Sequence, residues 1–191
     1  NPLGSLSGDD NQEWTMIRVL DNLSADYEVL PNLVFRSSWA IDLLNFQEFD
    51  FRNSRYGNGR NDGGTRSETI KNRTNWLGTQ TLTYDNSFGS NNFNVLLGYE
   101  AQRSSQREIR AFGAQFPPNA NLRTLENAAI GDPSSSALSE FAFTSIFSRL
   151  SYNYDYKYYL TASLRRDGSS RFGSETRFGN FWSLGASWRL D

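Results

Sequence analysis

A strict alternation of apolar and polar residues is the feature that most limits how this chain can fold. In residues 91–102, Phe93, Val95, Leu97 and Tyr99 are apolar, and the residues between them are mostly small or polar. Because successive side chains of a strand point to opposite faces of a sheet, this pattern predicts a strand with one apolar and one polar face. Stretches with the same period of two cover residues 17–29, 33–43, 76–84, 91–102, 142–154, 156–167 and 178–190.

The connections between these predicted strands alternate in length. Tight turns are predicted at residues 30–32, 85–92 and 155–157, and long polar loops at residues 51–68, 104–140 and 167–177. Antiparallel strands joined by short turns at one end and long loops at the other are typical of outer-membrane β-barrels. The sequence therefore predicts an all-β, antiparallel, transmembrane β-barrel segment.

A soluble β-sandwich also alternates and is the main alternative fold. Aromatic residues near the strand ends favour the barrel, because rings form girdles at the two interfaces between membrane and water. These residues are Tyr27, Trp76, Tyr84, Tyr152, Tyr154, Tyr158, Trp182 and Trp188. Bacterial barrels have even strand numbers, and an open edge in lipid leaves backbone groups without partners. About seven strands are therefore expected to be part of a larger barrel.

Composition excludes several classes of function. The chain has 191 residues, no cysteine, no histidine and a net charge of −2. It lacks a thiol nucleophile, the usual general base and the commonest transition-metal ligand. No overall basic field is present to bind nucleic acid. We therefore expect no enzyme, no metal site, no cofactor and no nucleic-acid partner.

Several segments together resemble the barrel of SusC/RagA-type TonB-dependent transporters in order and spacing. The most specific of them is SIFSRLSYNYDYKYYLTASLRRDGSSRFG (145–173), which joins two strands, a tight turn and an arginine-rich loop. The others are NPLGSL (1–6), YEVLPNLVFRSSWAIDLLNF (27–46), NWLGTQTLTYDNSFGSNNFNVLLGYEAQ (75–102), FPPNANLRTL (116–125) and GNFWSLGASWRL (179–190).

This resemblance implies a 22-stranded barrel in the outer membrane of Bacteroidota, filled by an N-terminal plug. It implies import of oligosaccharides or peptides together with a SusD-like surface lipoprotein, powered by the TonB complex. Residues 1–191 would then be part of the barrel domain, and the plug domain, the TonB box and the remaining strands would lie outside this chain. The alternative function is a soluble β-sheet surface module that binds glycans, which would stay in solution without detergent.

One predicted loop combines aromatic and amide side chains, within residues 111–128. Aromatic faces stack on sugar rings or apolar side chains, while amides supply hydrogen bonds. We therefore expect contact with substrate or lipoprotein from Phe112, Gln115, Phe116, Asn119, Asn121 and Arg123. The alternative is that Phe112, Phe116, Pro117 and Pro118 only pack the loop onto the barrel mouth. In either case, the apolar content of residues 106–138 predicts an ordered loop.

The stretch RRDGSSRFG (165–173) raises the question of a binding site or a simple hairpin tip. Asp167 and Gly168 are typical of a turn, and the loop is expected at the extracellular rim. Arg166 and Arg171 are candidates for contact with substrate or partner. The alternative is that the arginines pair with Asp167 and Glu175 and contact outer-membrane lipid, lipopolysaccharide or neighbouring loops.

Overall fold

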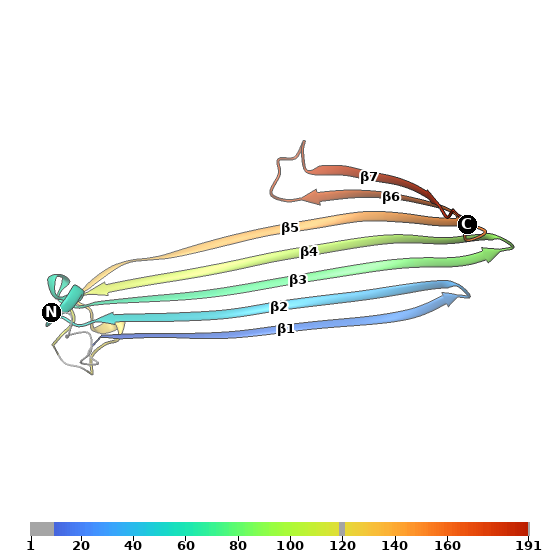
Figure 1. Cartoon of the computed structure of the whole chain (residues 1–191). Helices are drawn as coiled ribbons and strands as arrows, with labels where there is room; N and C mark the ends of the chain where they lie inside the picture. Colours follow the sequence, from blue (N-terminus) through green and yellow to red (C-terminus); the bar gives the residue numbers. More distant parts are fainter. Residues whose placement is uncertain (1–9, 119–120, 191) are drawn as a thin grey trace. The chain divides into compact units, whose positions relative to one another are not determined.

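The computed structural model describes residues 10–118 and 121–190, and its seven strands form a single antiparallel sheet. Each strand pairs with its neighbours in sequence, in the order β1 to β7 (Figure 1). The elements are β1 (Asn11–Leu30), β2 (Leu33–Arg52), the 3-10 helix η2 (Gly57–Asp62), β3 (Thr65–Phe88), β4 (Asn91–Ala114), the 3-10 helix η3 (Leu125–Asn127), β5 (Ile130–Tyr154), β6 (Tyr158–Ser169) and β7 (Phe178–Trp188). A sandwich needs two sheets, so that alternative is wrong for the described residues.

Residues with positive φ close the three tight turns. Asn32 has φ 69° after Pro31, which suits the third position of a type II turn between β1 and β2. Gly89 has φ 56° between β3 and β4. Asp155 and Tyr156 have φ 53° and 50°, the pairing required by a type I′ hairpin turn. The turns predicted at 30–32 and 155–157 are confirmed, whereas the turn predicted at 85–92 is shorter because pairing continues to Phe88.

Strands β1 to β5 are much longer than the alternation predicts. They contain 20, 20, 24, 24 and 25 residues, about twice the ~9–11 residues that cross a bilayer. The predicted loop at 104–140 is wrong over most of its length, because β4 continues to Ala114 and β5 begins at Ile130. The predicted loop at 51–68 is likewise reduced to residues 53–64. Beyond the apolar belt these strands carry mostly polar residues with scattered apolar ones such as Phe49 and Ile109, so the alternation becomes irregular while the backbone pairing continues.

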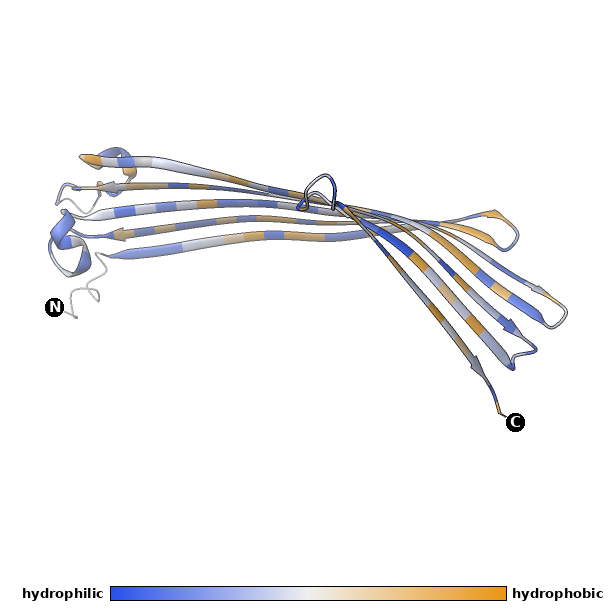
Figure 2. Cartoon of the chain, turned by 90° about the horizontal axis from the view of Figure 1, so that it is seen from above, coloured by the Kyte–Doolittle hydropathy of each residue, from blue (hydrophilic) through white to orange (hydrophobic). Residues whose placement is uncertain are grey.

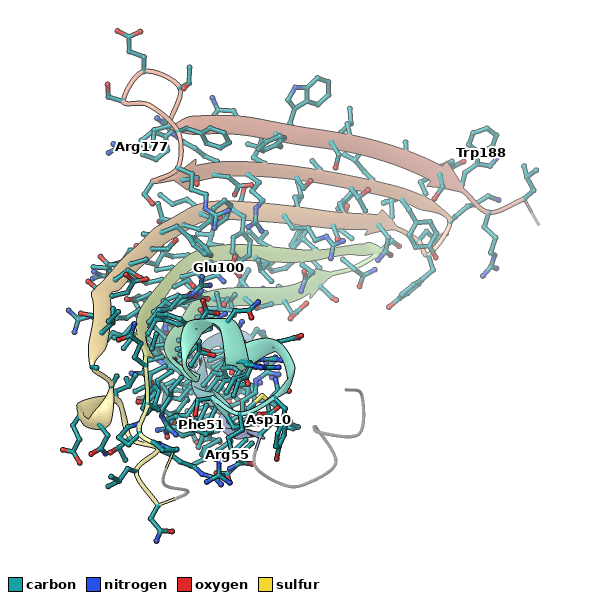
Figure 3. All side chains as sticks on the ribbon, turned by 90° about the vertical axis from the view of Figure 1, so that its left-hand side faces the viewer. Asp10, Phe51, Arg55, Glu100, Arg177 and Trp188 are labelled. Carbon is teal, nitrogen blue, oxygen red and sulfur yellow. The ribbon has the colours of Figure 1, made fainter. Side chains whose placement is uncertain are left out.

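The chain divides into two compact units, which are described separately. Unit 1 comprises Asn1–Val19, Leu43–Thr74 and Ser105–Ser139, and unit 2 comprises Leu20–Asp42, Asn75–Ser104 and Glu140–Asp191. Unit 1 holds the two longer connections of the sheet, and unit 2 holds the three tight turns and β6 and β7. Figure 3 labels Phe51 and Arg55 in unit 1, and Glu100 and Trp188 in unit 2.

Strand register in unit 2 separates an apolar face from a polar face. Tyr152 lies opposite Leu160, and Leu164 lies opposite Trp182. The rings of Phe93 and Tyr152 stack with centroids 6.0 Å apart, which places the apolar row of β4 on the same face. Alternate orange and blue bands mark this pattern along the strands (Figure 2). The apolar face comprises Phe93, Val95, Leu97, Tyr99, Ile146, Leu150, Tyr152, Tyr154, Tyr158, Leu160, Ala162, Leu164, Trp182, Leu184, Ala186 and Trp188.

The apolar face of unit 2 lies open rather than packed in a protein core. Leu97 is 52% exposed and Trp182 is 77% exposed. Among the described residues, the buried apolar side chains are Phe51, Ala114 and Phe116, and all three belong to unit 1. An open face of this size on strands demands an apolar surrounding, because contiguous exposed apolar patches on soluble proteins are small.

Candidate functional site

The candidate site of unit 1 is built from two connections that pack against each other, residues 53–64 and 115–129, which we call the docked loops. Their centre is an edge-to-face contact between Phe51 and Phe116, with ring centroids 5.3 Å apart and an interplanar angle of 85°. Phe51 is 6% exposed and Phe116 5%. Burial of two rings in this geometry stabilises the loops by area and by the favourable ring contact.

Backbone hydrogen bonds hold the docked loops together. The Gln115 N–H donates to the Asp62 and Gly64 carbonyls at 3.1 and 3.0 Å, and the Phe116 N–H donates to the Gly63 carbonyl at 2.9 Å. A Cβ on Gly63 would lie 3.2 Å from Gln115 Cα, and Gly63 has φ 68°. Both the close approach and the positive φ require glycine here.

A polar network extends the docked loops toward the start of β1. The Asp10 carboxylate accepts hydrogen bonds from the backbone N–H and side-chain amide of Asn53, at 2.8 and 2.6 Å. Asn53 in turn accepts from the Arg55 N–H at 2.8 Å, an Asx-type turn. The Arg55 guanidinium donates to the Pro118 carbonyl at 2.7 Å, which links the two loops a second time.

The second docked loop also packs against the sheet. Arg123 lies over the ring of Phe51, 5.2 Å from its centroid. A Cβ added at Gly113 would lie 2.7 Å from Ala128 and 3.2 Å from Leu125, so these side chains occupy the space that glycine leaves. The described residues 115–118 and 121–129 therefore form an ordered connection, which is much shorter than the loop predicted at 106–138.

The structure places the predicted contact residues of this region in different surroundings. Phe112 lies on β4 itself, 39% exposed. Gln115 and Asn121 are exposed on the second docked loop, whereas Phe116 is buried and Arg123 is half-buried. Asn119 lies outside the described residues. The exposed part of the docked loops therefore offers amides and prolines, while the aromatic ring of Phe116 belongs to their core.

The arginines of residues 165–173 belong to unit 2 and are held by aromatic rings and by two carboxylates, Asp167 and Glu100. Arg166 lies over Phe178 at 4.8 Å from the ring centroid, and Arg171 lies over Phe141 at 4.1 Å. The expected pairing with Asp167 is made by Arg165, at 2.6 Å. Residues 165–173 are thus the end of β6 and an ordered loop, in which the predicted Arg166 and Arg171 are each held by a ring of unit 2.

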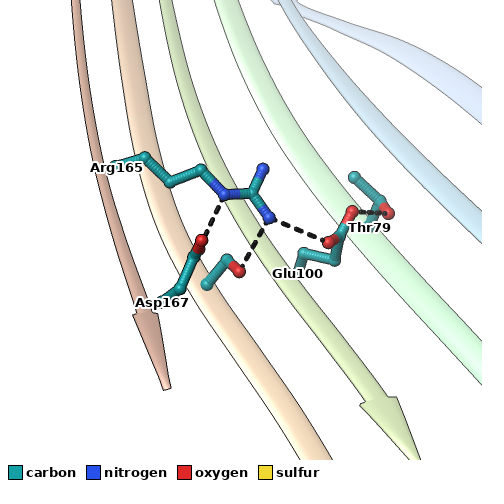
Figure 4. A network of polar contacts seen from close by, with 5 residues as sticks. Thr79, Glu100, Arg165 and Asp167 are labelled. Carbon is teal, nitrogen blue, oxygen red and sulfur yellow. Dashed lines mark hydrogen bonds and ion pairs between the residues drawn. The ribbon is translucent and has the colours of Figure 1, made fainter. Parts of the chain in front are cut away.

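A polar network on the polar face of unit 2 was not predicted from the sequence. Arg165 donates to Asp167, to the Ser145 hydroxyl at 2.9 Å and to Glu100 at 3.3 Å, while Thr79 donates to Glu100 at 3.3 Å (Figure 4). Ser145 is 1% exposed. Glu100 and Arg165 are 65 positions apart in sequence, so no local signal could have joined them.

An aromatic side chain completes the polar face beside this network. The Arg165 guanidinium also lies over the Phe147 ring, 5.4 Å from its centroid. A Cβ on Gly98 would lie only 2.1 Å from Phe147, so the ring covers the glycine of the neighbouring strand. The polar face thus carries charges, hydroxyls and several rings, among them Phe147 and Phe181, whereas the opposite face is mainly apolar. No helix in the described part of the chain is long and apolar enough to span a membrane.

A single antiparallel sheet with an open apolar face, a charged opposite face and connections that alternate between tight turns and longer loops defines a segment of an outer-membrane β-barrel wall. Known proteins agree. The chain is 33% identical to TonB-dependent receptor P3 of Formosa agariphila over 88% of this chain and 17% of that protein. It is 30% identical to TonB-dependent receptor SusC of Bacteroides thetaiotaomicron over 100% of this chain and 18% of that protein. No protein-family model matches the sequence.

Solved structures show the same fold. The RagAB peptide transporter superposes with a TM-score of 0.86 at 24% identity, over 96% of this chain and 21% of that chain. The ferric citrate transporter FecA superposes with a TM-score of 0.54 at 11% identity, over 91% of this chain and 24% of that chain.

The chain belongs to the SusC/RagA-type TonB-dependent receptors, a family of outer-membrane β-barrels, and spans about a fifth of the length of the relatives it matches. Proteins of this family are transporters and not enzymes, as predicted. The open apolar face and the family together argue against a soluble glycan-binding module.

Proposed function

We propose that this chain forms part of the wall and outer mouth of an active importer of oligosaccharides or peptides. The importer works with a SusD-like surface lipoprotein and takes energy from the TonB complex. The plug domain, the TonB box and the remaining barrel strands belong to segments outside residues 1–191. The proposal applies to the whole receptor the functions given in the names of its relatives. One is the TonB-dependent receptor function of P3, and another is the peptide transport of RagAB.

The observation that carries the proposal is the order of the docked loops. Long connections at one end of a scaffold commonly carry binding function, and a pre-organised loop loses less entropy on binding than a flexible one. Phe116 and Phe51 fix the loops from within, while Gln115 and Asn121 are exposed on their surface. Exposed amides can donate to and accept from the hydroxyls of a sugar or the backbone of a peptide.

The predicted contact residues are revised accordingly. Gln115 and Asn121 are proposed to touch substrate or lipoprotein directly, and Phe112 supplies an exposed ring beside them. Phe116 and Arg123 are proposed to act by positioning the loop, because one is buried and the other lies over Phe51. Asn119 stays a predicted contact on the same loop.

The test removes the middle of the second docked loop, which we call the tip, and keeps the contact between Phe116 and Phe51. The hydrogen bond from Arg55 to the Pro118 carbonyl is lost. In the full-length receptor, residues 117–122 are replaced by two glycines, which leaves Phe116 and Arg123 in place. We expect normal barrel folding, seen as heat-modifiable migration on a gel, but weaker co-purification of the surface lipoprotein and slower growth on the imported nutrient. A substitution in a tight turn, Ser90→Ala, is the matched control and should change neither readout.

Growth and lipoprotein capture separate the two possible contacts. Loss of growth with full capture assigns the tip to substrate, and loss of both assigns it to the lipoprotein. A variant that folds, captures the lipoprotein and grows like the parent receptor would refute the assignment of the docked loops to function.

A further inference from the structure

On β6 and β7, the apolar face is interrupted by one row of polar residues. Tyr158 lies opposite Trp188, and Leu164 lies opposite Trp182. The next row on the same face pairs Arg166 with Asn180. Toward Tyr158 and Trp188 this face presents large exposed apolar side chains. At this row β6 and β7 present a cation and an amide next to the exposed Ile146 of β5, and the exposed Phe178 follows one row beyond.

The Arg166 side chain reaches away from the apolar rows. Its guanidinium lies over the ring of Phe178, which pairs with Gly168 one row beyond Arg166. Among the described residues, Arg166 has no acidic side chain within ion-pair distance. Charged ends of long side chains extend toward water while the stems stay on apolar surface, and this is the direction that Arg166 takes.

The position of this row agrees with the edge of a membrane. Arg166 lies eight positions after Tyr158 on β6, which is about 26 Å along a strand at ~3.3 Å per residue. With the ~40° strand tilt of outer-membrane barrels, this corresponds to roughly 20 Å across a membrane whose apolar band is about 25 Å tall. With the aromatic row of Tyr158 and Trp188 at one interface, the outstretched guanidinium reaches the level of headgroups at the other.

We infer that Arg166 binds the phosphate group of an outer-leaflet lipid. The guanidinium supplies a charge-assisted donor fork that matches phosphate oxygens, and the Asn180 amide lies beside it on the same face. The acyl chains of that lipid lie along Leu164 and Trp182, which are 63% and 77% exposed. Stacking on Phe178 holds the guanidinium in place, and no acidic side chain of the described residues pairs with it.

The same hairpin offers a matched control on its other face. Arg177 lies opposite Ser169, because the Ser169 N–H donates to the Arg177 carbonyl at 3.0 Å. Ser169 shares the polar face with Asp167, two positions earlier on β6. A lipid contact therefore requires Arg166 and not Arg177, which Figure 3 labels beside the loop between β6 and β7.

The experiment measures lipid retention by the full-length receptor in detergent, using native mass spectrometry. The probes are lipid A with two phosphates and the same lipid after removal of its phosphates. We expect the parent receptor to retain the phosphorylated lipid, R166Q to lose about tenfold in retention, R166K to recover part of it, and R177Q to behave like the parent. Millimolar inorganic phosphate should not compete, since a free anion lacks the acyl chains.

Each of the other outcomes overturns the proposal. Equal retention by R166Q and the parent, equal losses in R166Q and R177Q, or equal retention of the two lipid probes would each refute a phosphate contact at Arg166. Full competition by inorganic phosphate would assign the arginine to a soluble anion. Heat-modifiable migration on a gel checks that every variant folds like the parent. Because the experiment measures lipid retention and not nutrient uptake, its outcome is independent of the test of the importer function.

Discussion

Removing the ring of Phe116 should release the docked loops without unfolding the sheet. The ring is 5% exposed and meets Phe51 edge to face at 5.3 Å. Core Phe→Ala substitutions cost ~3–5 kcal/mol, and we take the lower end because this core has only three buried apolar side chains among the described residues. A local loss of about 3 kcal/mol raises the undocked population of the loops roughly a hundredfold.

Hydrogen exchange of the full-length receptor measures this opening directly. The amides of Gln115 and Phe116 donate across the docked loops, so their protection reports on docking. In Phe116→Ala we expect their protection to fall by up to about a hundredfold, while amides in residues 146–152 stay protected.

Phe112→Ala is the control, because Phe112 is 39% exposed and its ring is not part of the buried contact. It should reduce protection of the docked loops by much less than Phe116→Ala. Unchanged protection in Phe116→Ala would refute the packing argument. A comparable loss of protection in residues 146–152 would show that the loops and the membrane belt unfold together, against the division into two units.

Two further predictions concern the faces of unit 2. Leu97→Arg puts a charge on the apolar face and should destabilise the folded receptor in lipid by about 2–4 kcal/mol, whereas Leu96→Arg on the polar face should cost far less. Denaturant unfolding in vesicles compares the two variants. Equal losses of stability would refute the assignment of Leu97 to the lipid-facing side. Gly98→Ala brings a Cβ within 2.1 Å of Phe147 and should lower the free energy of unfolding by ~1–3 kcal/mol. Gly131→Ala, whose Cβ would have nothing within 4 Å, should leave it unchanged. Similar denaturant midpoints for the two variants would show that the Phe147 ring moves freely.

The sequence predicts the belt of this fold well because one physical cause acts there. Side chains such as Leu97 and Leu164 face a uniform apolar surrounding, so every second residue there is apolar and the sequence shows the period of two directly. Past Tyr99, strand β4 continues through mostly polar residues in which the alternation is no longer regular, and the backbone pairing continues. A polar strand and a polar loop have similar compositions, which explains why residues 104–114 were predicted as a loop.

The candidate site is harder to predict because its contacts join distant parts of the chain. Phe116 looks like an exposed stacking residue in sequence, and only its partner Phe51 makes it a core residue. Arg166 and Arg171 look alike in sequence, yet each is held by a ring from a different strand, Phe178 and Phe141. Residue types identified these positions as important, but the spatial partner decides between packing and binding.

The alternation of tight and wide connections also bears on how the sheet is made. The turns at Asn32 and Asp155 leave almost no chain to close, whereas residues 53–64 and 115–129 must be looped out before their flanking strands can meet. Because the entropy of loop closure grows with loop length, β1–β2, β3–β4 and β5–β6 can each form as a local hairpin ahead of the pairings between them. The unit of assembly of this sheet is therefore the two-stranded hairpin. The strand pairings that flank the docked loops form last.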